Sequence, residues 1–129
     1  MRAYSGVVMT QRGRMASKMA PGEITQELLD EATGVSLYPG TFNVRLSAAV
    51  AVPKYAGRVE RGDVTRDLAD TIHIVPARVN GIDGWMIRHL LVEQWTGHAH
   101  QRDVVEIVSE VCLRDALGLA DGDPVTVEF

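Results

Sequence analysis

The sequence has 129 residues, which predicts a single domain over residues 1–129 that is large enough to bury a core. Hydrophobic residues make up 46% and charged residues 23%, proportions that are ordinary for a soluble globular protein. The formal net charge of −4 argues against a general nucleic-acid binder, because such proteins are usually basic, so any phosphate would need a local cluster of positive charge.

The first third of the sequence predicts a strand followed by a helix. Residues 3–10 are mostly apolar and are typical of a strand. In residues 23–33, Ile24, Leu28 and Ala32 recur at four-residue spacing, so we expect an amphipathic helix with these side chains on its buried face. The glycine after this segment stands where a C-terminal cap residue should.

The remainder of the sequence predicts five more strands and a second short helix. The strands are expected from alternating or continuous apolar runs at residues 42–48, 71–79, 85–93, 104–108 and 125–129. Residues 54–70 are polar and are expected to be rich in loops, and residues 80–84 should form a hairpin loop. Pro76 lies inside a predicted strand, which predicts an edge position or a bulge. Ser109 is expected to cap the helix at residues 110–117.

The order of these elements favours one fold class. Six short strands with turn signals between them and only two short helices predict a mainly β fold, a small six-stranded barrel, rather than a doubly wound sheet. The regular alternation of strand and helix that parallel βαβ units need is missing from the sequence.

The sequence also constrains the location of the protein. Cys112 is the only cysteine, so no internal disulfide can form and a cytoplasmic setting is the default expectation. The apolar stretch in residues 1–10 is too short for the core of a signal peptide, and no run approaches the roughly 20 apolar residues of a membrane span. We therefore expect no membrane partner.

Two sequence motifs resemble those of one enzyme family. Residues 37–46, LYPGTFNVRL, resemble the YPGTLNV signature of the CTP-dependent riboflavin kinases. The runs at residues 105–108, 113–115 and 119–125 resemble the C-terminal motifs of the same family, at the family's spacing, and the match covers nearly the whole chain in order. The resemblance implies a cradle-loop (RIFT-type) barrel that transfers the γ-phosphate of CTP to riboflavin, giving FMN, with Mg²⁺ as cofactor.

Thr41 and Asn43 are the candidate metal ligands in the first motif. They lie two residues apart, and residues at this spacing in a strand point to the same side. Their hydroxyl and amide oxygens can therefore meet one hard cation, and Mg²⁺ prefers oxygen ligands. The resemblance implies that these two residues hold Mg²⁺. The alternative is a turn threonine followed by an exposed strand asparagine.

Two segments are candidates for binding the nucleotide. The first occupies the position of the family's glycine-rich loop and comprises Arg12, Gly13, Arg14, Met15, Ala16, Ser17 and Lys18. It holds a single glycine, unlike the family's loop, but its three cations can bind phosphates. The resemblance implies a second nucleotide-binding stretch at Cys112, Leu113, Arg114 and Asp115. The alternatives are a solvated basic loop for the first segment and, for the second, an exposed helical Arg114 with Leu113 in the core.

Glu106 and His98 match the flavin-contacting positions of the family. Glu106 stands between apolar residues of a predicted strand, so its carboxylate should point out of the strand, where it can bind the ribityl hydroxyl or act as the general base. His98 replaces the family's threonine, and Thr96 is an alternative for that contact. His98 and His100 also allow a transition-metal pair, although no third ligand stands near them in the sequence.

Three functions stay open from the sequence. The first is the kinase, with CTP and riboflavin as its small-molecule partners and no nucleic acid. The second is a catalytically altered homologue that binds nucleotide or flavin as a sensor, or phosphorylates a different small molecule, and the glycine-poor segment favours it. The third is a DNA-binding regulator, against which the net charge of −4 argues. Trp85 and Trp95 can stack on a flavin ring or belong to the core.

Overall fold

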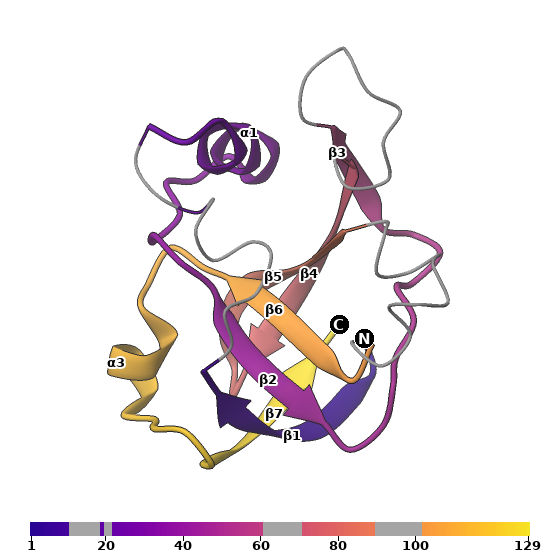
Figure 1. Cartoon of the computed structure of the whole chain (residues 1–129), viewed down its shortest axis with the longest axis vertical. Helices are drawn as coiled ribbons and strands as arrows, with labels where there is room; N and C mark the ends of the chain where they lie inside the picture. The colour runs from indigo at the N-terminus through magenta and orange to yellow at the C-terminus, as the bar shows by residue number, and fades with distance from the viewer. Residues whose placement is uncertain (11–18, 20–21, 61–70, 90–101) are drawn as a thin grey trace.

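The computed structural model describes residues 1–10, 19, 22–60, 71–89 and 102–129 (Figure 1). Within these residues the strands and helices follow one another as β1 (Ala3–Met9), α1 (Ile24–Thr33), β2 (Phe42–Leu46), β3 (Gly57–Glu60), β4 (Thr71–Val79), β5 (Ile82–His89), β6 (Val104–Val108), α3 (Leu113–Leu117) and β7 (Pro124–Glu128). No helix in this described part of the chain is long and apolar enough to cross a membrane.

Six of the strands close into an antiparallel barrel. Around the ring the order is β4, β5, β6, β2, β1 and β7, and β7 pairs with β4 to complete it, with Val127 opposite Val79. The pairing of β1 with β7 continues past the strands, where the N–H of Arg2 donates to the carbonyl oxygen of Phe129 (2.9 Å). Closure removes the free edges that an open sheet would expose. The predicted six-stranded, mainly β barrel with two short helices is therefore confirmed.

β3 is a further strand that lies outside the ring. It pairs antiparallel with the first half of β4, with Gly57 opposite Ile74 at one end of the ladder. The expectation of a loop-rich segment at residues 54–70 is therefore wrong for this stretch. The strand was missed because Val59 is its only large apolar side chain, so its extended form depends on pairing with β4 rather than on an apolar pattern.

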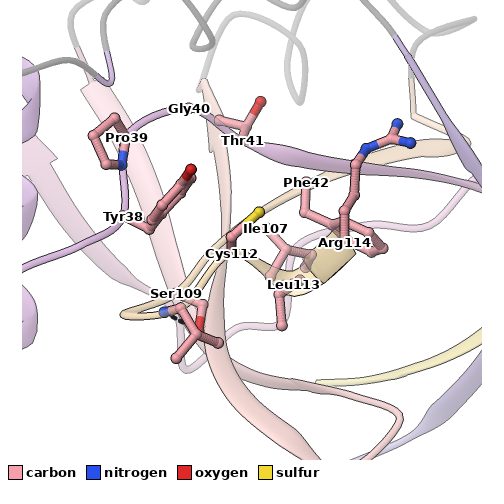
Figure 2. A pocket seen from close by; sticks show the side chains of 11 residues that line it. Tyr38, Pro39, Gly40, Thr41, Phe42, Ile107, Ser109, Cys112, Leu113 and Arg114 are labelled. Atoms are coloured by element: carbon pink, nitrogen blue, oxygen red, sulfur yellow. Dashed lines mark hydrogen bonds between the residues drawn. The ribbon is translucent and has the colours of Figure 1, made fainter. Parts of the chain in front are cut away.

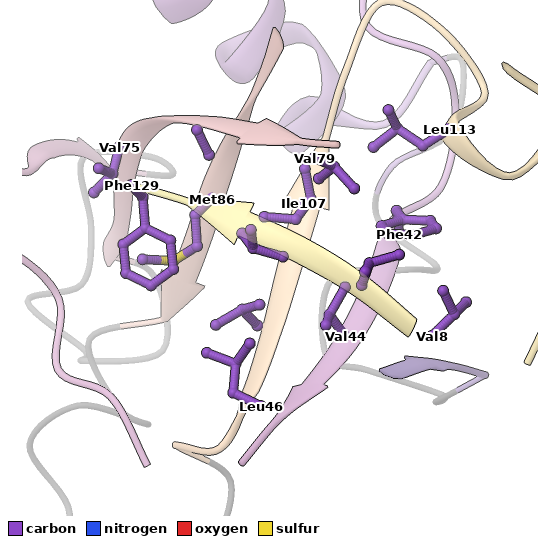
Figure 3. Close-up of a cluster of buried hydrophobic side chains, with 14 residues drawn as sticks. Val8, Phe42, Val44, Leu46, Val75, Val79, Met86, Ile107, Leu113 and Phe129 are labelled. Carbon is purple, nitrogen blue, oxygen red and sulfur yellow. The ribbon is translucent and has the colours of Figure 1, made fainter. Parts of the chain in front are cut away.

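The inside of the barrel is filled by apolar side chains from every strand of the ring. In β2, Phe42, Val44 and Leu46 point inward, as the predicted alternation requires. Figure 3 shows these side chains converging with those of the other strands. The buried members of this core are Val8, Phe42, Val44, Leu46, Val75, Ala77, Val79, Met86, Val105, Ile107, Leu113, Val125, Val127 and Phe129. Asn43, between two inward residues, consequently points to the outside of the barrel.

α1 covers the outside of the barrel with a face that the sequence pattern did not predict. Gln26 and Leu29 are buried, whereas Ile24 is 55% exposed, Leu28 is half-buried and Ala32 is exposed. The expected face of Ile24, Leu28 and Ala32 is therefore wrong. Leu29 belongs to an outer cluster of buried apolar residues between helix and sheet, made of Met19, Leu29, Leu37, Ile72, Ile87 and Val108.

Two polar side chains of α1 account for this orientation. Gln26 Nε2 donates to the carbonyl oxygen of Leu37 (2.9 Å), and the N–H of Leu37 donates to Asp30 Oδ1 (2.9 Å). Gln26 and Asp30 are four residues apart and share one face of the helix, which must turn toward the chain that follows it. At 100° per residue, Leu29 lies about 60° from Gln26 and Ile24 about 160° from it, so Leu29 turns inward and Ile24 outward.

The hairpin between β4 and β5 is tighter than the sequence predicted. Its loop consists of Asn80 and Gly81, both with positive φ, because Val79 already pairs with Ile82. Asn-Gly is the pair that favours this two-residue turn. Pro76 lies between the stretch of β4 that pairs with β3 and the stretch that pairs with β7, so among the described pairings it occupies a local edge, as predicted.

α3 begins later than the sequence predicted. It spans Leu113–Leu117, with Cys112 at the N-terminal cap position. Ser109 does not cap this helix, and that expectation is wrong. Its hydroxyl instead donates to the carbonyl oxygen of Asp83 (2.8 Å), which ties the end of β6 to β5.

Candidate functional site

A pocket of about 210 Å³ lies between the turn that leads into β2, the end of β6 and α3 (Figure 2). The walls of this motif pocket are Tyr38, Pro39, Gly40, Thr41, Phe42, Ile107, Ser109, Val111, Cys112, Leu113 and Arg114. The fold thus brings together residues of both sequence motifs. Sites for drug-sized ligands commonly enclose about 300–1,000 Å³, so the described walls are too small to enclose such a ligand completely.

The turn on one side of the motif pocket is fixed by hydrogen bonds from two directions. On the side of α1, Gln26 and Asp30 hold both backbone polar groups of Leu37. On the side of β6, the carbonyl oxygen of Ser109 accepts a hydrogen bond from the N–H of Tyr38 (2.8 Å). Side chains on so constrained a turn keep a defined position, as a binding site requires.

Gly40 connects this turn to the first candidate nucleotide segment. Its φ of 91° lies in the left-handed region that favours glycine. In this conformation its N–H donates to the carbonyl oxygen of Met19 (2.6 Å). Met19 is buried, and it is the residue that follows residues 12–18 in the sequence.

Thr41 and Asn43 lie close together, as their spacing predicts. Thr41 Oγ1 donates a hydrogen bond to Asn43 Oδ1, and the two oxygens are 3.1 Å apart. Two ligands on one edge of an octahedron with Mg–O bonds of about 2.1 Å lie about 3.0 Å apart, so this oxygen pair fits adjacent positions of a Mg²⁺ shell. Among the described residues there is no group of three His, Cys, Asp or Glu that could hold a metal ion.

Glu106 points to the same side of the sheet as Asn43. The two residues are directly opposite each other in the antiparallel β2–β6 pair, where Cβ atoms are about 4.5–5.5 Å apart. Val105 and Ile107 on either side belong to the barrel core, and one carboxylate oxygen of Glu106 is itself buried. The expectation that Glu106 points out of an apolar strand is therefore confirmed, and the fold brings it beside the metal-ligand candidates.

The second candidate nucleotide stretch divides between pocket and core. Leu113 is a core side chain that also forms part of the pocket wall, and Cys112 and Arg114 line the pocket, whereas Asp115 is exposed and lies outside the lining. The electrostatic influence of the neighbouring Cys112 side chain, together with a hydrogen bond between the two side chains, raises the pKa of Tyr38 above its usual value. Tyr38 is thus a neutral phenol at neutral pH.

Arg114 is held by an ion pair at the edge of the motif pocket. Its Nη2 lies 2.6 Å from Asp121 Oδ1 and also donates to the carbonyl oxygen of Met9 (3.2 Å) and to Thr10 Oγ1 (3.3 Å). The hydrogen bond from Arg114 lowers the pKa of Asp121, so this carboxylate is ionised at neutral pH. Thr10, which stands two residues before the first nucleotide segment in the sequence, is therefore held at the edge of the pocket.

Several expected site residues lie outside the described part of the chain: Arg12, Gly13, Arg14, Met15, Ala16, Ser17, Lys18, Trp95, Thr96, His98 and His100. Their roles stay predictions. Trp85 is half-buried and packs against the outer cluster, as the core alternative for this residue expected.

Three residues around the pocket were not singled out as functional from the sequence. Ser109 was expected only to cap a helix and Thr10 only to end a strand, and no role of its own was assigned to Asp121. Asp121 belongs to the C-terminal motif, which was the available signal. Its contact with Thr10 joins opposite ends of the chain, and no periodicity in the sequence reports such a contact.

The chain matches one protein family over most of its length. Residues 22–129 match the family model of the CTP-dependent riboflavin kinase domain, described as a domain of unknown function, DUF120. The chain belongs to the CTP-dependent riboflavin kinase family. The resemblance inferred from the two motifs is thereby confirmed, and the motif pocket lies where the family's two motifs meet.

Curated relatives in the family come from archaea. The riboflavin kinase of Pyrobaculum arsenaticum is 29% identical over 135 residues, which cover 90% of this chain and 58% of that protein. The riboflavin kinase of Aeropyrum pernix is 34% identical over 109 residues, covering 75% of this chain and 74% of that protein. The riboflavin kinase of Methanopyrus kandleri is 31% identical over 107 residues, covering 78% and 65%. The chain thus spans between about half and three quarters of the length of these relatives.

Proposed function

We propose that this protein is a phosphotransferase that moves the γ-phosphate of CTP to riboflavin, giving FMN and CDP, with Mg²⁺ as its cofactor. The observation that carries the proposal is the oxygen pair of Thr41 and Asn43, spaced as one edge of a Mg²⁺ shell and placed beside Glu106. Family membership and the relatives named riboflavin kinase support the reaction and the acceptor. The family's name supports CTP as the donor.

The residues present fit Mg²⁺ as the metal. Thr41 Oγ1 and Asn43 Oδ1 would be its protein ligands, and the hydrogen bond between them keeps the two oxygens at the required spacing. Bound at this pair, the ion would neutralise charge on the nucleotide phosphates.

Glu106 would be the general base of the reaction. Its carboxylate would accept the proton of the terminal ribityl hydroxyl as that oxygen bonds to the γ-phosphorus. The bond from the γ-phosphorus to the bridging oxygen breaks, and CDP leaves with its electron pair. The position of Glu106 opposite Asn43 supports this role, because it keeps the base one strand spacing from the metal ligand. We propose that His98, together with Glu106, contacts the flavin.

The nucleotide would lie between the motif pocket and residues 12–18. Thr10 and Met19, which stand on either side of that segment in the sequence, both contact residues of the pocket, and the three cations of the segment would add to the positive charge of Arg114. Arg114 would bind a phosphate oxygen at the rim. The half-exposed ring of Tyr38 offers an apolar surface against which the base can pack.

Turnover with matched variants tests the proposal. Purified protein is incubated with riboflavin, Mg²⁺ and CTP, ATP, GTP or UTP in turn, and FMN is measured by chromatography. We expect FMN to form with CTP, and we expect Thr41→Ala or Asn43→Ala to form it about 100-fold more slowly. Each substitution removes one oxygen ligand of the Mg²⁺ that would stabilise the charge on the phosphates. Thr126→Ala, which removes an exposed hydroxyl from β7, should leave the rate unchanged.

The outcomes separate the parts of the proposal. FMN formed with another nucleotide and not with CTP would keep the reaction and reject the donor. Equal loss of activity in Thr126→Ala would mean that the oxygen pair has no special role. No FMN with any of the four nucleotides, from protein shown to be folded, would overturn the kinase proposal.

A second candidate is a catalytically altered homologue that binds nucleotide or flavin, or phosphorylates a different small molecule. The observation that favours it is the single glycine, Gly13, in residues 11–20, because phosphate-binding loops commonly use the backbone N–H groups that glycines expose. Calorimetric binding of CTP without FMN formation would support this alternative. A cytoplasmic location is proposed in either case, since Cys112 has no cysteine to pair with.

A further inference from the structure

The contacts of Arg114 leave part of its guanidinium facing the motif pocket. All hydrogen bonds that Arg114 makes to described residues use Nη2, so Nη1 and Nε are available to a ligand. Figure 2 shows the guanidinium of Arg114 and the hydroxyl of Thr41 extending toward the same side of the pocket. A guanidinium held in this way presents a planar pair of donors, which matches the geometry of a phosphate.

Asp121 fixes that orientation from the opposite side. Its Oδ1 accepts from Arg114 Nη2 at 2.6 Å, and its Oδ2 accepts from Thr10 Oγ1 at 2.8 Å. One carboxylate therefore holds both a side chain of the pocket and Thr10, the residue that follows β1. With both oxygens in use, Asp121 links these two parts of the site through a single group.

The turn that carries Asp121 is itself anchored to β1. The N–H of Gly122 donates to the carbonyl oxygen of Val8 (2.8 Å), and the N–H of Val8 donates to the carbonyl oxygen of Asp123 (2.9 Å). Asp123 Oδ2 also accepts from the N–H of Ala120 (2.8 Å), which closes the turn. An ion pair between two freely moving side chains specifies little geometry, whereas a carboxylate on an anchored turn can hold its partner in one orientation.

We propose that Asp121 is a positioning residue for nucleotide binding, which holds Arg114 so that its remaining donors meet a phosphate of the nucleotide in the motif pocket. The inference deepens the proposed function and rests on it. Asp121 does not touch the nucleotide in this arrangement, so its effect on binding passes through Arg114. Removing the Asp121 carboxylate should therefore weaken the binding of the nucleotide, which carries phosphates, more than that of the nucleoside.

Calorimetric titration of CTP and of cytidine, in the presence of Mg²⁺ and without riboflavin, tests the inference on the full chain. Asp121→Asn should raise the Kd of CTP about tenfold, because a loosened guanidinium no longer starts in the binding geometry, and should leave the Kd of cytidine unchanged. Asp121→Glu should recover most of the CTP affinity. The matched control is Asp83→Asn, which breaks another exposed Asp–Arg pair, with Arg78 at 3.0 Å on the β4–β5 hairpin.

A double-mutant cycle shows whether the effect passes through Arg114. If Asp121 acts by positioning Arg114, the double variant Arg114→Lys/Asp121→Asn should bind CTP hardly more weakly than Arg114→Lys alone. Additive losses would overturn the inference. If Asp121→Asn fails to fold, Asp121→Ala replaces it, and a raised Kd of CTP with an unchanged Kd of cytidine carries the same support.

The remaining outcomes are distinct. If Asp121→Asn and Asp83→Asn have equal Kd values for CTP, the inference is wrong and the proposed function is unaffected. The same holds if Asp121→Asn weakens the binding of CTP and of cytidine equally. Failure of the wild-type protein to bind any nucleotide overturns the proposed function, and the inference with it.

Discussion

Replacing Leu29 with alanine should destabilise the protein strongly, whereas replacing Ile24 with alanine should not. Leu29 is fully buried in the outer cluster between α1 and the barrel, and Leu→Ala changes at such positions cost about 2–5 kcal/mol of unfolding free energy. Ile24 is 55% exposed on the opposite side of the helix, so its truncation should change stability by less than about 0.5 kcal/mol. A small gain is expected there from the better helix propensity of alanine.

Urea unfolding followed by circular dichroism measures both costs. With an unchanged slope, the midpoint should fall clearly for Leu29→Ala and hardly move for Ile24→Ala. For a chain of this length each kcal/mol corresponds to about 3–5 °C in melting temperature, so thermal scans should separate the variants by about 6–25 °C. A large cost for Ile24→Ala with a small one for Leu29→Ala would mean that α1 buries the face expected from the apolar spacing, and the argument from Gln26 and Asp30 would fail.

Three further changes have defined outcomes. Gly84→Ala should lower the free energy of unfolding by about 1–3 kcal/mol, because an added Cβ would lie 2.6 Å from a backbone oxygen of β6. Gly57→Ala should lower it by less than about 1 kcal/mol, because the nearest atom to an added Cβ is a side-chain carbon at 3.2 Å. Equal losses of stability in urea unfolding would contradict this. Cys112→Ala should lower the pKa of Tyr38 toward its usual value of about 10, and an unchanged phenolate absorbance titration would refute the contact. The lowered pKa of Asp121 in the folded protein means that its ion pair stabilises the fold at pH values above the unfolded pKa of about 3.9. This stabilisation is lost as the pH falls through the lower pKa of the folded state. Asp121→Asn should therefore be less stable than the wild type at pH 7 but equally stable at low pH, and a difference that persists at low pH would contradict the ion pair.

The barrel strands could be predicted from the sequence because their side chains alternate between core and surface. Phe42, Val44 and Leu46 show the pattern, and the structure places all three inside the barrel. β3 lacks such a pattern and is extended only because β4 offers it a partner. The buried face of α1 was mispredicted for a related reason, since Gln26 and Asp30 turn the helix through hydrogen bonds to the next segment, which apolar periodicity does not record.

The candidate site could be predicted in part. Two-residue spacing was enough to place Thr41 and Asn43 together, and the alternation of β6 was enough to point Glu106 outward. That Glu106 would face Asn43 depends on the pairing register between β2 and β6, which one sequence does not specify. The contact of Arg114 with Asp121 was likewise not predictable, because it depends on how α3 and the following turn pack against the end of β1.

Residues 2 and 129 lie side by side where β1 pairs with β7, and this arrangement suits the protein to circular permutation. Arg2 and Phe129 are joined by two backbone hydrogen bonds (2.9 and 3.1 Å), and the rings of Tyr4 and Phe129 stack beside them at 4.7 Å. The six residue steps from Ala3 to Met9 separate this point from the motif pocket by about 20 Å along β1. A short peptide linker between Arg2 and Phe129 should therefore yield a circular permutant with an unaltered ring of strands, and a reporter protein fused at either point would sit about 20 Å from the motif pocket.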